Sequence, residues 1–376
     1  MVSSSNQAAG SQMSFEARLG LQQRVLPAYR APFFNLLGRS SVQGLSVFAG
    51  EPRSDETIRN ATDLEFAEWI RADNTYLLSA SWYFLWQKGI IGWLNRADPD
   101  VLILEANPRY LSNRAAMRWM HERKRPVIGW ALGAPANSGF LAGARTWLRR
   151  RYLLRFDALI AYSSKGAAEY MEVGFPQERI FTAYNAVASA PKTKPERTSL
   201  RGRRPRLLFV GRLQPRKRID LLLEACAHLG EEVELVIVGD GPARGRFEAL
   251  AAELLPRARF TGAVYGEALQ SWFEWADIFI LPGTGGLAVQ QAMAAGLPVI
   301  VARGDGTQSD LVTPQNGWLV PPDDVEGLLE AIKAALQDPE AMLEMGLASY
   351  ELSRTRFNIE AMAAVFLKAI DSVWKA

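Results

Sequence analysis

In the second half of the chain, short apolar runs alternate with longer segments whose apolar residues recur at helical spacing. The apolar runs predict strands at residues 206–211, 233–241, 258–264, 277–283, 298–302 and 317–320. The other segments predict helices at residues 218–230, 243–254, 267–276, 285–296 and 324–338. Near-continuous apolar strands separated by amphipathic helices are typical of a parallel sheet that is covered on both faces.

The first half alternates less regularly. Its apolar runs predict strands at residues 18–26, 44–50, 75–80, 100–107, 125–133 and 157–163, and a helix pattern spans residues 109–124. The chain is therefore predicted to have an α/β fold in which two doubly wound, Rossmann-like domains face each other across a cleft. Ligands of such sheets bind at the carboxyl ends of the strands, so this cleft is the expected ligand site.

Shifts in composition mark the expected domain boundaries. Residues 188–205 are rich in Pro, Lys, Arg, Ser and Thr and precede a new strand, which is typical of an interdomain linker. The first residues are small and polar, which favours a disordered tail over a signal peptide. The expected parts are a tail (1–16), a first domain (17–187), the linker (188–205), a second domain (206–355) and a C-terminal helix docking back on the first domain (356–376).

Composition narrows the class of protein. The chain has 376 residues, of which 48% are hydrophobic and 22% charged, and no apolar run is long enough to predict a transmembrane helix. Its one cysteine, Cys226, excludes an internal disulfide and fits the reducing cytoplasm. Two histidines and one cysteine do not predict a metal site. A net charge of +3 does not predict nucleic-acid binding.

The segment 209–225 carries the most specific chemistry. A predicted strand ends at Gly211, where the missing side chain lets a ligand approach the backbone. Arg212 and Lys217 then flank a turn before a helix N-terminus, and two cations beside free N–H groups suit a diphosphate. The alternative interpretation is a solvated basic turn.

Two further glycine-containing turns follow predicted strands. Gly262 lies where its backbone either meets a ligand or forms a structural bend. The turn at 282–286 is rich in glycine and opens a helix, yet residues 282–302 contain no charged side chain. Such a turn binds phosphates through backbone N–H groups and the helix dipole.

The second half resembles, segment after segment, the nucleotide-sugar-binding half of retaining GT-B glycosyltransferases of the glycosyltransferase family 4 (glycosyl transferases group 1) type. The matching segments, in order, are FVGRLQPRKR, LVIVGDGP, FTGAV, WADIFILPG, GGLAVQQAMAAGLPVI and NGWLVPPDD. The resemblance covers residues 205–335 and extends to Tyr184–Val187. The segment 21–34 is similar to the opening strand and loop of a subgroup involved in polysaccharide assembly.

The resemblance implies transfer of a hexose-type sugar, with retention, from a nucleoside diphosphate sugar to a glycan or lipid-linked acceptor in cell-envelope or exopolysaccharide synthesis. It implies no metal and no cofactor besides the donor substrate. Arg212 and Lys217 match the family's cations, which neutralise the leaving diphosphate. The donor-binding residues that it implies are Gly211, Gly262, Gly283, Thr284, Gly285, Gly286, Leu287 and Gln291.

The chain departs from the family pattern at three positions. The family's donor loop carries two glutamates eight positions apart, where this chain has Gly283 and Gln291. Leu132 stands where the family's first domain has a histidine near the reacting sugar. Asp305 and Gln308 follow a later predicted strand and are candidates for the missing hydroxyl contacts.

The first domain offers candidate residues for the acceptor side. Glu105 ends a predicted strand and is the candidate carboxylate base. Candidate sugar or acceptor contacts at strand ends are Tyr29, Arg30, Asn107 and Arg109. A structural contact is the alternative for Arg30.

The basic, aromatic segment 145–155 has two interpretations. One is peripheral contact with an anionic membrane, at the inner face of the plasma membrane. The other is a helix that packs Leu and Trp inward and Arg outward. The expected partners are thus the nucleotide-sugar donor, the acceptor and a membrane surface, without nucleic acid.

The main alternative function is a non-catalytic nucleotide-sugar-binding homologue that supports a partner transferase. The replacements at Gly283, Gln291 and Leu132 favour this alternative. An epimerase or a phosphorylase on the same fold is disfavoured, because the acids, bases or cofactor lysine that these enzymes need are not evident in the sequence.

Overall fold

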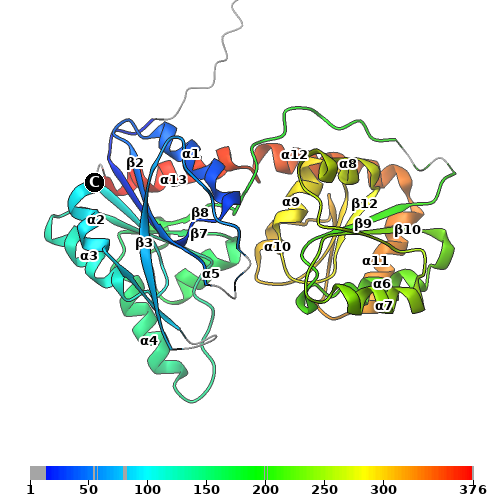
Figure 1. The fold of residues 1–376 in the computed structure, drawn as a ribbon, viewed down its shortest axis with the longest axis horizontal. Coiled ribbons are helices and arrows are strands. Elements are labelled where there is room, and N and C mark those ends of the chain that lie inside the picture. Colours follow the sequence, from blue (N-terminus) through cyan, green and yellow to red (C-terminus); the bar gives the residue numbers. More distant parts are fainter. Residues whose placement is uncertain are drawn as a thin grey trace, which may run out of the picture. The chain divides into compact units, whose positions relative to one another are not determined.

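A computed structural model describes residues 14–53, 56, 58–78, 83–198, 200 and 202–374. The chain divides into two compact units (Figure 1). Unit 1 comprises Met1–Tyr162, Gly166–Ala183 and Ala363–Ala376, and unit 2 comprises Ser163–Lys165 and Tyr184–Met362. Residues 1–13 of the expected tail lie outside the described residues, whereas Phe15 already pairs with Ser41 of unit 1.

Unit 1 is built on a sheet whose described strands run in the order β4-β3-β2-β1-β5-β6-β7-β8. Neighbouring strands are parallel, except that β4 is antiparallel to β3. The strands are β1 (Leu19–Val25), β2 (Leu45–Gly50), β3 (Glu68–Leu77), β4 (Phe84–Lys88), β5 (Val101–Glu105), β6 (Val127–Ala131), β7 (Ala158–Ala161) and β8 (Ile180–Thr182). The central strands are buried almost throughout, as expected for a sheet covered on both faces.

Helices from both ends of the chain cover this sheet (Figure 1). They are α1 (Ala31–Ser40), α2 (Ile90–Ala97), α3 (Ser112–Glu122), α4 (Ala142–Leu153), α5 (Ser164–Glu172) and the end of α13 (Ile359–Trp374). Phe366 of α13 lies 5.0 Å from Phe33 of α1 and 4.9 Å from Trp130 of β6 between ring centroids. The last helix therefore packs into the core of unit 1.

Unit 2 holds a parallel sheet whose described strands run in the order β11-β10-β9-β12-β13-β14. This is the 3-2-1-4-5-6 order of dinucleotide-binding folds. The strands are β9 (Arg206–Val210), β10 (Glu234–Val238), β11 (Arg259–Gly262), β12 (Ile278–Leu281), β13 (Val299–Ala302) and β14 (Gly317–Val320). The helices are α6 (Ile219–Ala227), α7 (Arg244–Leu254), α8 (Gly266–Trp275), α9 (Leu287–Ala294), α10 (Thr307–Leu311), α11 (Val325–Gln337) and α12 (Pro339–Thr355).

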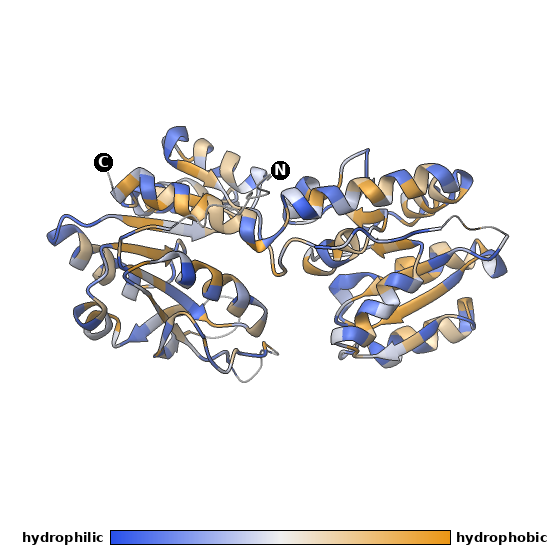
Figure 2. Cartoon of the chain, turned by 90° about the horizontal axis from the view of Figure 1, so that it is seen from above, coloured by the Kyte–Doolittle hydropathy of each residue, from blue (hydrophilic) through white to orange (hydrophobic). Residues whose placement is uncertain are grey.

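Apolar strands form the core of each unit, and Figure 2 shows most of the strands as hydrophobic segments between helices of mixed character. The sequence prediction missed β4, β8, α10 and α12, and it started β3 several residues late. In β4 exposed and buried residues alternate, as expected for an edge strand rather than a buried run. Among the described residues, no helix is both long and apolar enough to cross a membrane.

The boundary between the units lies at Ala183/Tyr184 rather than after residue 187. The ring of Tyr184 packs 5.2 Å from that of Phe357, which holds this residue on unit 2. The described residues from Ala183 to Pro205 form neither helix nor strand, yet Arg197 donates hydrogen bonds to several carbonyls of unit 2. The linker is therefore attached to unit 2 along part of its length.

Candidate functional site

Unit 2 has its topological switch point between the neighbouring strands β9 and β12. The strands β10 and β11 follow on one side of this pair, and β13 and β14 follow on the other side. Loops after two such strands diverge and leave a crevice, where ligands of this kind of sheet bind. The loop 211–218 follows β9 and the loop 282–286 follows β12. These two segments, called the switch-point loops below, hold both candidate catalytic cations and most candidate donor-binding residues.

Lys217 joins the two switch-point loops. Its ammonium donates to the carbonyl oxygen of Thr284 at 2.5 Å, and Arg216 donates through Nη1 to the Thr284 hydroxyl at 2.9 Å. The backbone N–H of Thr284 donates in return to the Arg216 carbonyl at 3.1 Å. Burial, with a smaller contribution from the charge of Arg216, lowers the pKa of Lys217 to about 8. A bound phosphate would favour the charged ammonium, so this position suits an anionic ligand.

Close packing of the switch-point loops explains two of their glycines. A Cβ on Gly283 would overlap the carbonyl of Arg216 and the backbone of Lys217. A Cβ on Gly285 would overlap the Lys217 ammonium, and Gly285 also has a φ of +142°, which L side chains rarely adopt. The missing side chain at position 283 is therefore required by the way in which these loops pack.

The helix α9 begins beside these glycines, with Gly286 as its N-cap and Leu287 as its first residue. Its first backbone N–H groups lack carbonyl partners within the helix and are available to an anion. Gln291 is exposed on the second turn, as a side chain that contacts a ligand must be. The neighbouring Gln290 is buried and donates to the carbonyl of Asn185.

Asp305 and Gln308 both have structural roles after β13. Asp305 accepts hydrogen bonds from the backbone N–H of Thr307 at 3.0 Å and from its hydroxyl at 2.6 Å, at the start of α10. Gln308 is fully buried and donates to the Gly285 carbonyl at 2.7 Å. The structure therefore corrects the expected contact of Gln308 with sugar hydroxyls. Its side chain is buried and holds the loop 282–286 through the Gly285 carbonyl.

Gly211 and Gly262 belong to one series of close backbone contacts. The N–H of Gly239 donates to the Gly262 carbonyl at 2.8 Å, and the N–H of Gly211 donates to the Val238 carbonyl at 3.0 Å. A Cβ on Gly239 would overlap the Gly211 carbonyl. Arg212 follows directly and is half-buried. Ligand contacts of these residues stay predictions.

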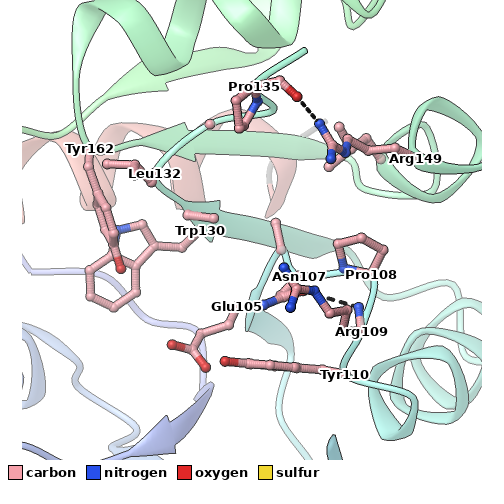
Figure 3. Close-up of a pocket in the computed structure, with 14 residues that line it drawn as sticks. Glu105, Asn107, Pro108, Arg109, Tyr110, Trp130, Leu132, Pro135, Arg149 and Tyr162 are labelled. Carbon is pink, nitrogen blue, oxygen red and sulfur yellow. Dashed lines mark hydrogen bonds between the residues drawn. The ribbon is translucent and has the colours of Figure 1, made fainter. Parts of the chain in front are cut away.

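Unit 1 has its own switch point, between β1 and β5. A cavity of about 410 Å³ opens at the carboxyl ends of β5 and β6 and is called the unit 1 pocket (Figure 3). Its lining residues are Glu105–Tyr110, Trp130–Gly133, Pro135, Arg149, Leu153 and Tyr162. The pocket thus brings together three of the acceptor-side candidates, Glu105, Asn107 and Arg109.

Glu105, the candidate carboxylate base, lies in this pocket. Burial raises its pKa to about 7, although a hydrogen bond from the Arg24 backbone and the charges of Arg24 and Arg30 act in the opposite direction. The Arg24 N–H donates to Glu105 Oε2 at 2.7 Å, which fixes the carboxylate. In Figure 3 the carboxylate points toward the side chain of Tyr110. A carboxyl group that titrates near neutral pH suits proton transfer.

Arg30 does not line the unit 1 pocket. Its side chain is 5% exposed, and its guanidinium carbon lies 5.0 Å from the ring of Trp130 and 5.6 Å from that of Tyr162. The rings are part of the pocket wall, so Arg30 lies behind them. The structure favours the structural alternative for Arg30, while Tyr29 is exposed.

Leu132 and Arg149 also line the unit 1 pocket. Leu132 is partly exposed in the lining, and an aliphatic side chain there cannot exchange a proton. Arg149 was not singled out from the sequence as a site residue. Its only sequence signal is the basic segment 145–155, whose place beside the pocket the residue pattern does not reveal.

Among the described residues, no group of three or more His, Cys, Asp or Glu side chains could hold a metal ion. Metal independence stays a prediction.

Residues 204–338 match the family described as glycosyl transferases group 1. The D-inositol 3-phosphate glycosyltransferase of Xylanimonas cellulosilytica is 30% identical over 326 residues, covering 80% of this chain and 73% of that protein. The GDP-mannose-dependent alpha-mannosyltransferase of Mycolicibacterium smegmatis is 32% identical over 270 residues, covering 66% of each chain. The match thus spans just under two thirds of that relative's length.

Solved structures share the whole fold at low sequence identity. The structure of Anabaena Alr3699/HepE in complex with UDP has a TM-score of 0.71 at 17% identity, covering 94% of this chain and 99% of the other. Sucrose-phosphate synthase from Thermosynechococcus elongatus has a TM-score of 0.70 at 19% identity, covering 95% and 99%. The expected α/β fold of the GT-B class is confirmed.

Proposed function

Because the chain belongs to the glycosyl transferases group 1 family, we propose that it moves a hexose-type sugar from a nucleoside diphosphate sugar to a glycan or lipid-linked acceptor. The proposal includes retention of anomeric configuration, independence of metal ions, and a place in cell-envelope or exopolysaccharide synthesis. It also places the protein in the cytoplasm, in peripheral contact with the inner face of the membrane.

The observation that carries the proposal is the contact of Lys217 with Thr284 at the switch point of unit 2. It sets a desolvated ammonium beside the N-terminus of α9, where the diphosphate of a donor would lie. Negative charge grows on the diphosphate as the bond to the sugar breaks. Lys217, Arg212 and the α9 N–H groups neutralise that charge in the proposed reaction.

The unit 1 pocket supplies the acceptor side of the proposal. Glu105 accepts the proton of the acceptor hydroxyl that attacks the sugar, since its raised pKa matches this task near neutral pH. Asn107 and Arg109 lie beside it in the same lining and orient the acceptor.

Nucleoside diphosphate release across a panel of donor sugars tests the proposal. GDP-mannose and UDP-glucose come first, because relatives are described as GDP-mannose-dependent and neighbours were solved with UDP or UDP-glucose. Release that increases with added membrane extract supports transfer. Donor binding without release, for every donor and extract, would overturn the enzymatic proposal.

The second candidate function is a non-catalytic nucleotide-sugar-binding homologue that supports a partner transferase. Leu132 favours it, because a leucine in the pocket lining replaces the histidine of the resembling family. Gly283 favours it less than the sequence suggested, since the packing of the switch-point loops requires glycine there. A partner transferase whose rate rises on addition of this inactive protein would support it.

A further inference from the structure

The strand β1 has a bulge at Arg24, beside the carboxyl end of β5. Its ladder with β2 pairs Gln23 with Ala49 and Val25 with Gly50, so Arg24 is an extra residue on the β1 side. The backbone groups of such a residue lie outside the regular ladder, and bulges beside active sites redirect the residues around them. The N–H and the carbonyl of Arg24 are therefore available to side-chain partners.

Two side chains contact these backbone groups. The Arg24 N–H donates to Oε2 of Glu105 at 2.7 Å, and the Arg24 carbonyl accepts a hydrogen bond from Nδ2 of Asn74 at 2.8 Å. Glu105 ends β5 and Asn74 belongs to β3, so the bulge joins strands from both sides of β1. A backbone donor has much less freedom than a long side chain, so this contact restricts where the carboxylate of Glu105 can point.

Buried amides connect Glu105 and Asn74 by a second route. The Glu105 N–H donates to Oε1 of Gln22 at 3.1 Å, and Nε2 of Gln22 donates to Oε1 of Gln87 at 2.5 Å. Nε2 of Gln87 then donates to Oδ1 of Asn74 at 2.9 Å. With the two contacts of Arg24, these bonds close a ring, called the amide ring below, through Glu105, Gln22, Gln87, Asn74 and Arg24.

All bonds of the amide ring run in one direction, because each member donates to the next and accepts from the one before. Hydrogen bonds arranged in this way polarise and strengthen one another where the dielectric is low. Gln22 and Gln87 are fully buried, where a polar group that lost its partner would be costly. Turning one amide over would place donor against donor, so the ring fixes the orientation of its members.

The Arg24 N–H also affects the charge of Glu105. Burial is the main cause that raises the pKa of Glu105 to about 7, and the hydrogen bond from the Arg24 backbone is the largest of the contacts that lower it. The charges of Arg24 and Arg30 and a hydrogen bond with Tyr110 act in the same direction. The charged and titratable groups around the carboxyl group, besides Arg24, are Arg30, Arg109, Tyr110, Arg149, Tyr152 and Tyr162.

We propose that Gln22, Gln87 and Asn74 are positioning residues for Glu105. Through the amide ring and the bulge at Arg24, they aim its carboxylate into the unit 1 pocket, where it meets the acceptor hydroxyl. Within the described part of the chain, none of the three lines that pocket, so they act through Glu105 and Arg24. The catalytic role of the ring rests on the proposed function, in which Glu105 accepts the proton. The hold of the ring on the carboxylate does not.

Carbon-13 NMR of the full chain, labelled at the glutamate side-chain carboxyl groups, tests this hold without any turnover. The Glu105 signal is identified by its loss in Glu105→Gln and should titrate near pH 7 in the wild type. In Gln87→Leu its midpoint should rise by about one pH unit, because the Arg24 N–H is no longer held in place to stabilise the ionised carboxylate. Gln43→Leu, at an exposed glutamine of unit 1, is the control and should keep the wild-type midpoint.

A second variant covers the case in which Gln87→Leu does not fold. Asn74 is half-buried and lines a second cavity, of about 520 Å³, so water can replace its amide in Asn74→Ala. This variant loses the donor to the Arg24 carbonyl and should raise the Glu105 midpoint in the same direction by a smaller amount. Thermal unfolding shows which variants are folded. A midpoint that stays or falls in every folded ring variant would overturn the proposal.

Sugar transfer by the same variants tests the catalytic role of the ring. Gln87→Leu and Asn74→Ala should lower kcat about tenfold, since a misplaced catalytic group costs rate. The KM for the donor should be unchanged, and the pH profile of kcat/KM should move upward together with the NMR midpoint. A merely structural role would reduce the amount of active protein without moving the profile. Lower activity with the wild-type pH profile would therefore overturn the positioning role.

The proposed function and the positioning role fail in different ways. Absence of nucleotide binding or of sugar transfer in the wild type would contradict the proposed function, while the NMR midpoints would still show whether the ring holds the carboxylate. Full turnover by Glu105→Gln would exclude Glu105 as the base and with it the catalytic role of the ring. Turnover that depends on Glu105, with a midpoint that neither ring variant moves, would overturn the positioning role alone.

Discussion

The ammonium of Lys217 and the carbonyl oxygen of Thr284 lie 2.5 Å apart, although 66 residues separate them in the chain. This contact ties the loop after β9 to the loop after β12, the two strands between which the strand order of unit 2 reverses. It leaves a cation on a surface of backbone N–H groups at the start of α9. Cations and backbone N–H groups bind a diphosphate, so the lack of acidic side chains in residues 282–302 does not argue against a diphosphate site.

Lys217→Gln is expected to weaken binding of the donor nucleotide about 10- to 100-fold, because a charge-assisted hydrogen bond to phosphate is worth roughly 1.5–3 kcal/mol. Calorimetric titration with UDP and GDP measures this, with Lys333→Gln, an exposed lysine on α11, as the control. The pKa of Lys217, lowered to about 8, adds a pH dependence. Nucleotide affinity should fall as the pH rises above about 8, and the Lys217→Gln protein should lack this component.

Gly283→Ala is expected to destabilise unit 2, because the added Cβ overlaps the backbone at Arg216 and Lys217. Gly245→Ala is the matched control, since a Cβ on Gly245 in α7 meets nothing within 4 Å. That change should stabilise the protein by about 0.5–1 kcal/mol, as is typical of Gly to Ala within a helix. Thermal unfolding measures both. If Gly283→Ala unfolds at the wild-type temperature, the packing explanation for the glycine is untenable.

The sequence predicted the strands of unit 2 well, because buried parallel strands read as continuous apolar runs. It could not reveal that Gly283 lies against the turn at 216–217, since close approach of two backbones leaves no mark on either segment alone. Without that contact, a glycine at this position resembles a lost side chain. The order of the strands, which brings Lys217 to the loop 282–286, is likewise a tertiary property.

The unit 1 pocket was only partly predictable. Glu105 and Asn107 were identified because they end a clear apolar run, and strand ends gather at one edge of a sheet. Arg149 belongs to α4, and the loop that connects β6 to this helix has no periodic pattern from which its place at the pocket could be predicted. The sequence left a ligand contact and a structural contact open for Arg30, and its burial behind Trp130 depends on packing across the sheet.

Glu105→Gln is expected to abolish most sugar transfer while leaving nucleotide binding unchanged, because the amide cannot accept the acceptor's proton. In the wild type, kcat/KM should rise with pH through about 7, as the carboxyl group with its raised pKa becomes ionised. Glu122→Gln, at an exposed glutamate on α3, is the control and should keep the wild-type profile. A Glu105→Gln enzyme with full turnover would exclude Glu105 as the base.

The same shift predicts how stability depends on pH. The pKa of Glu105 is raised from 4.5 to about 7 in the folded protein, so the folded state keeps a proton that the unfolded state releases. The contribution of this group to the free energy of unfolding should therefore decrease as the pH rises from about 4.5 to about 7. Denaturant titrations of the wild type and Glu105→Gln across this range measure it, and parallel curves for the two proteins would contradict the prediction.

Arg197→Met is expected to lower the free energy of unfolding by roughly 2–4 kcal/mol, because it removes the donor from several carbonyls at once. The guanidinium donates to Ala295 at 2.7 Å, to Ala276 at 2.5 Å and to Phe273 at 2.7 Å, and burial lowers the pKa of Arg197 to about 10. Ala276 and Ala295 are the C-cap residues of α8 and α9, and Phe273 lies in the last turn of α8, so the linker residue donates to carbonyls at two helix ends. Lys194→Met changes an exposed cation three residues earlier and should alter stability by less than about 0.5 kcal/mol. Equal unfolding midpoints for the two variants would show that the linker is held to unit 2 by something other than Arg197.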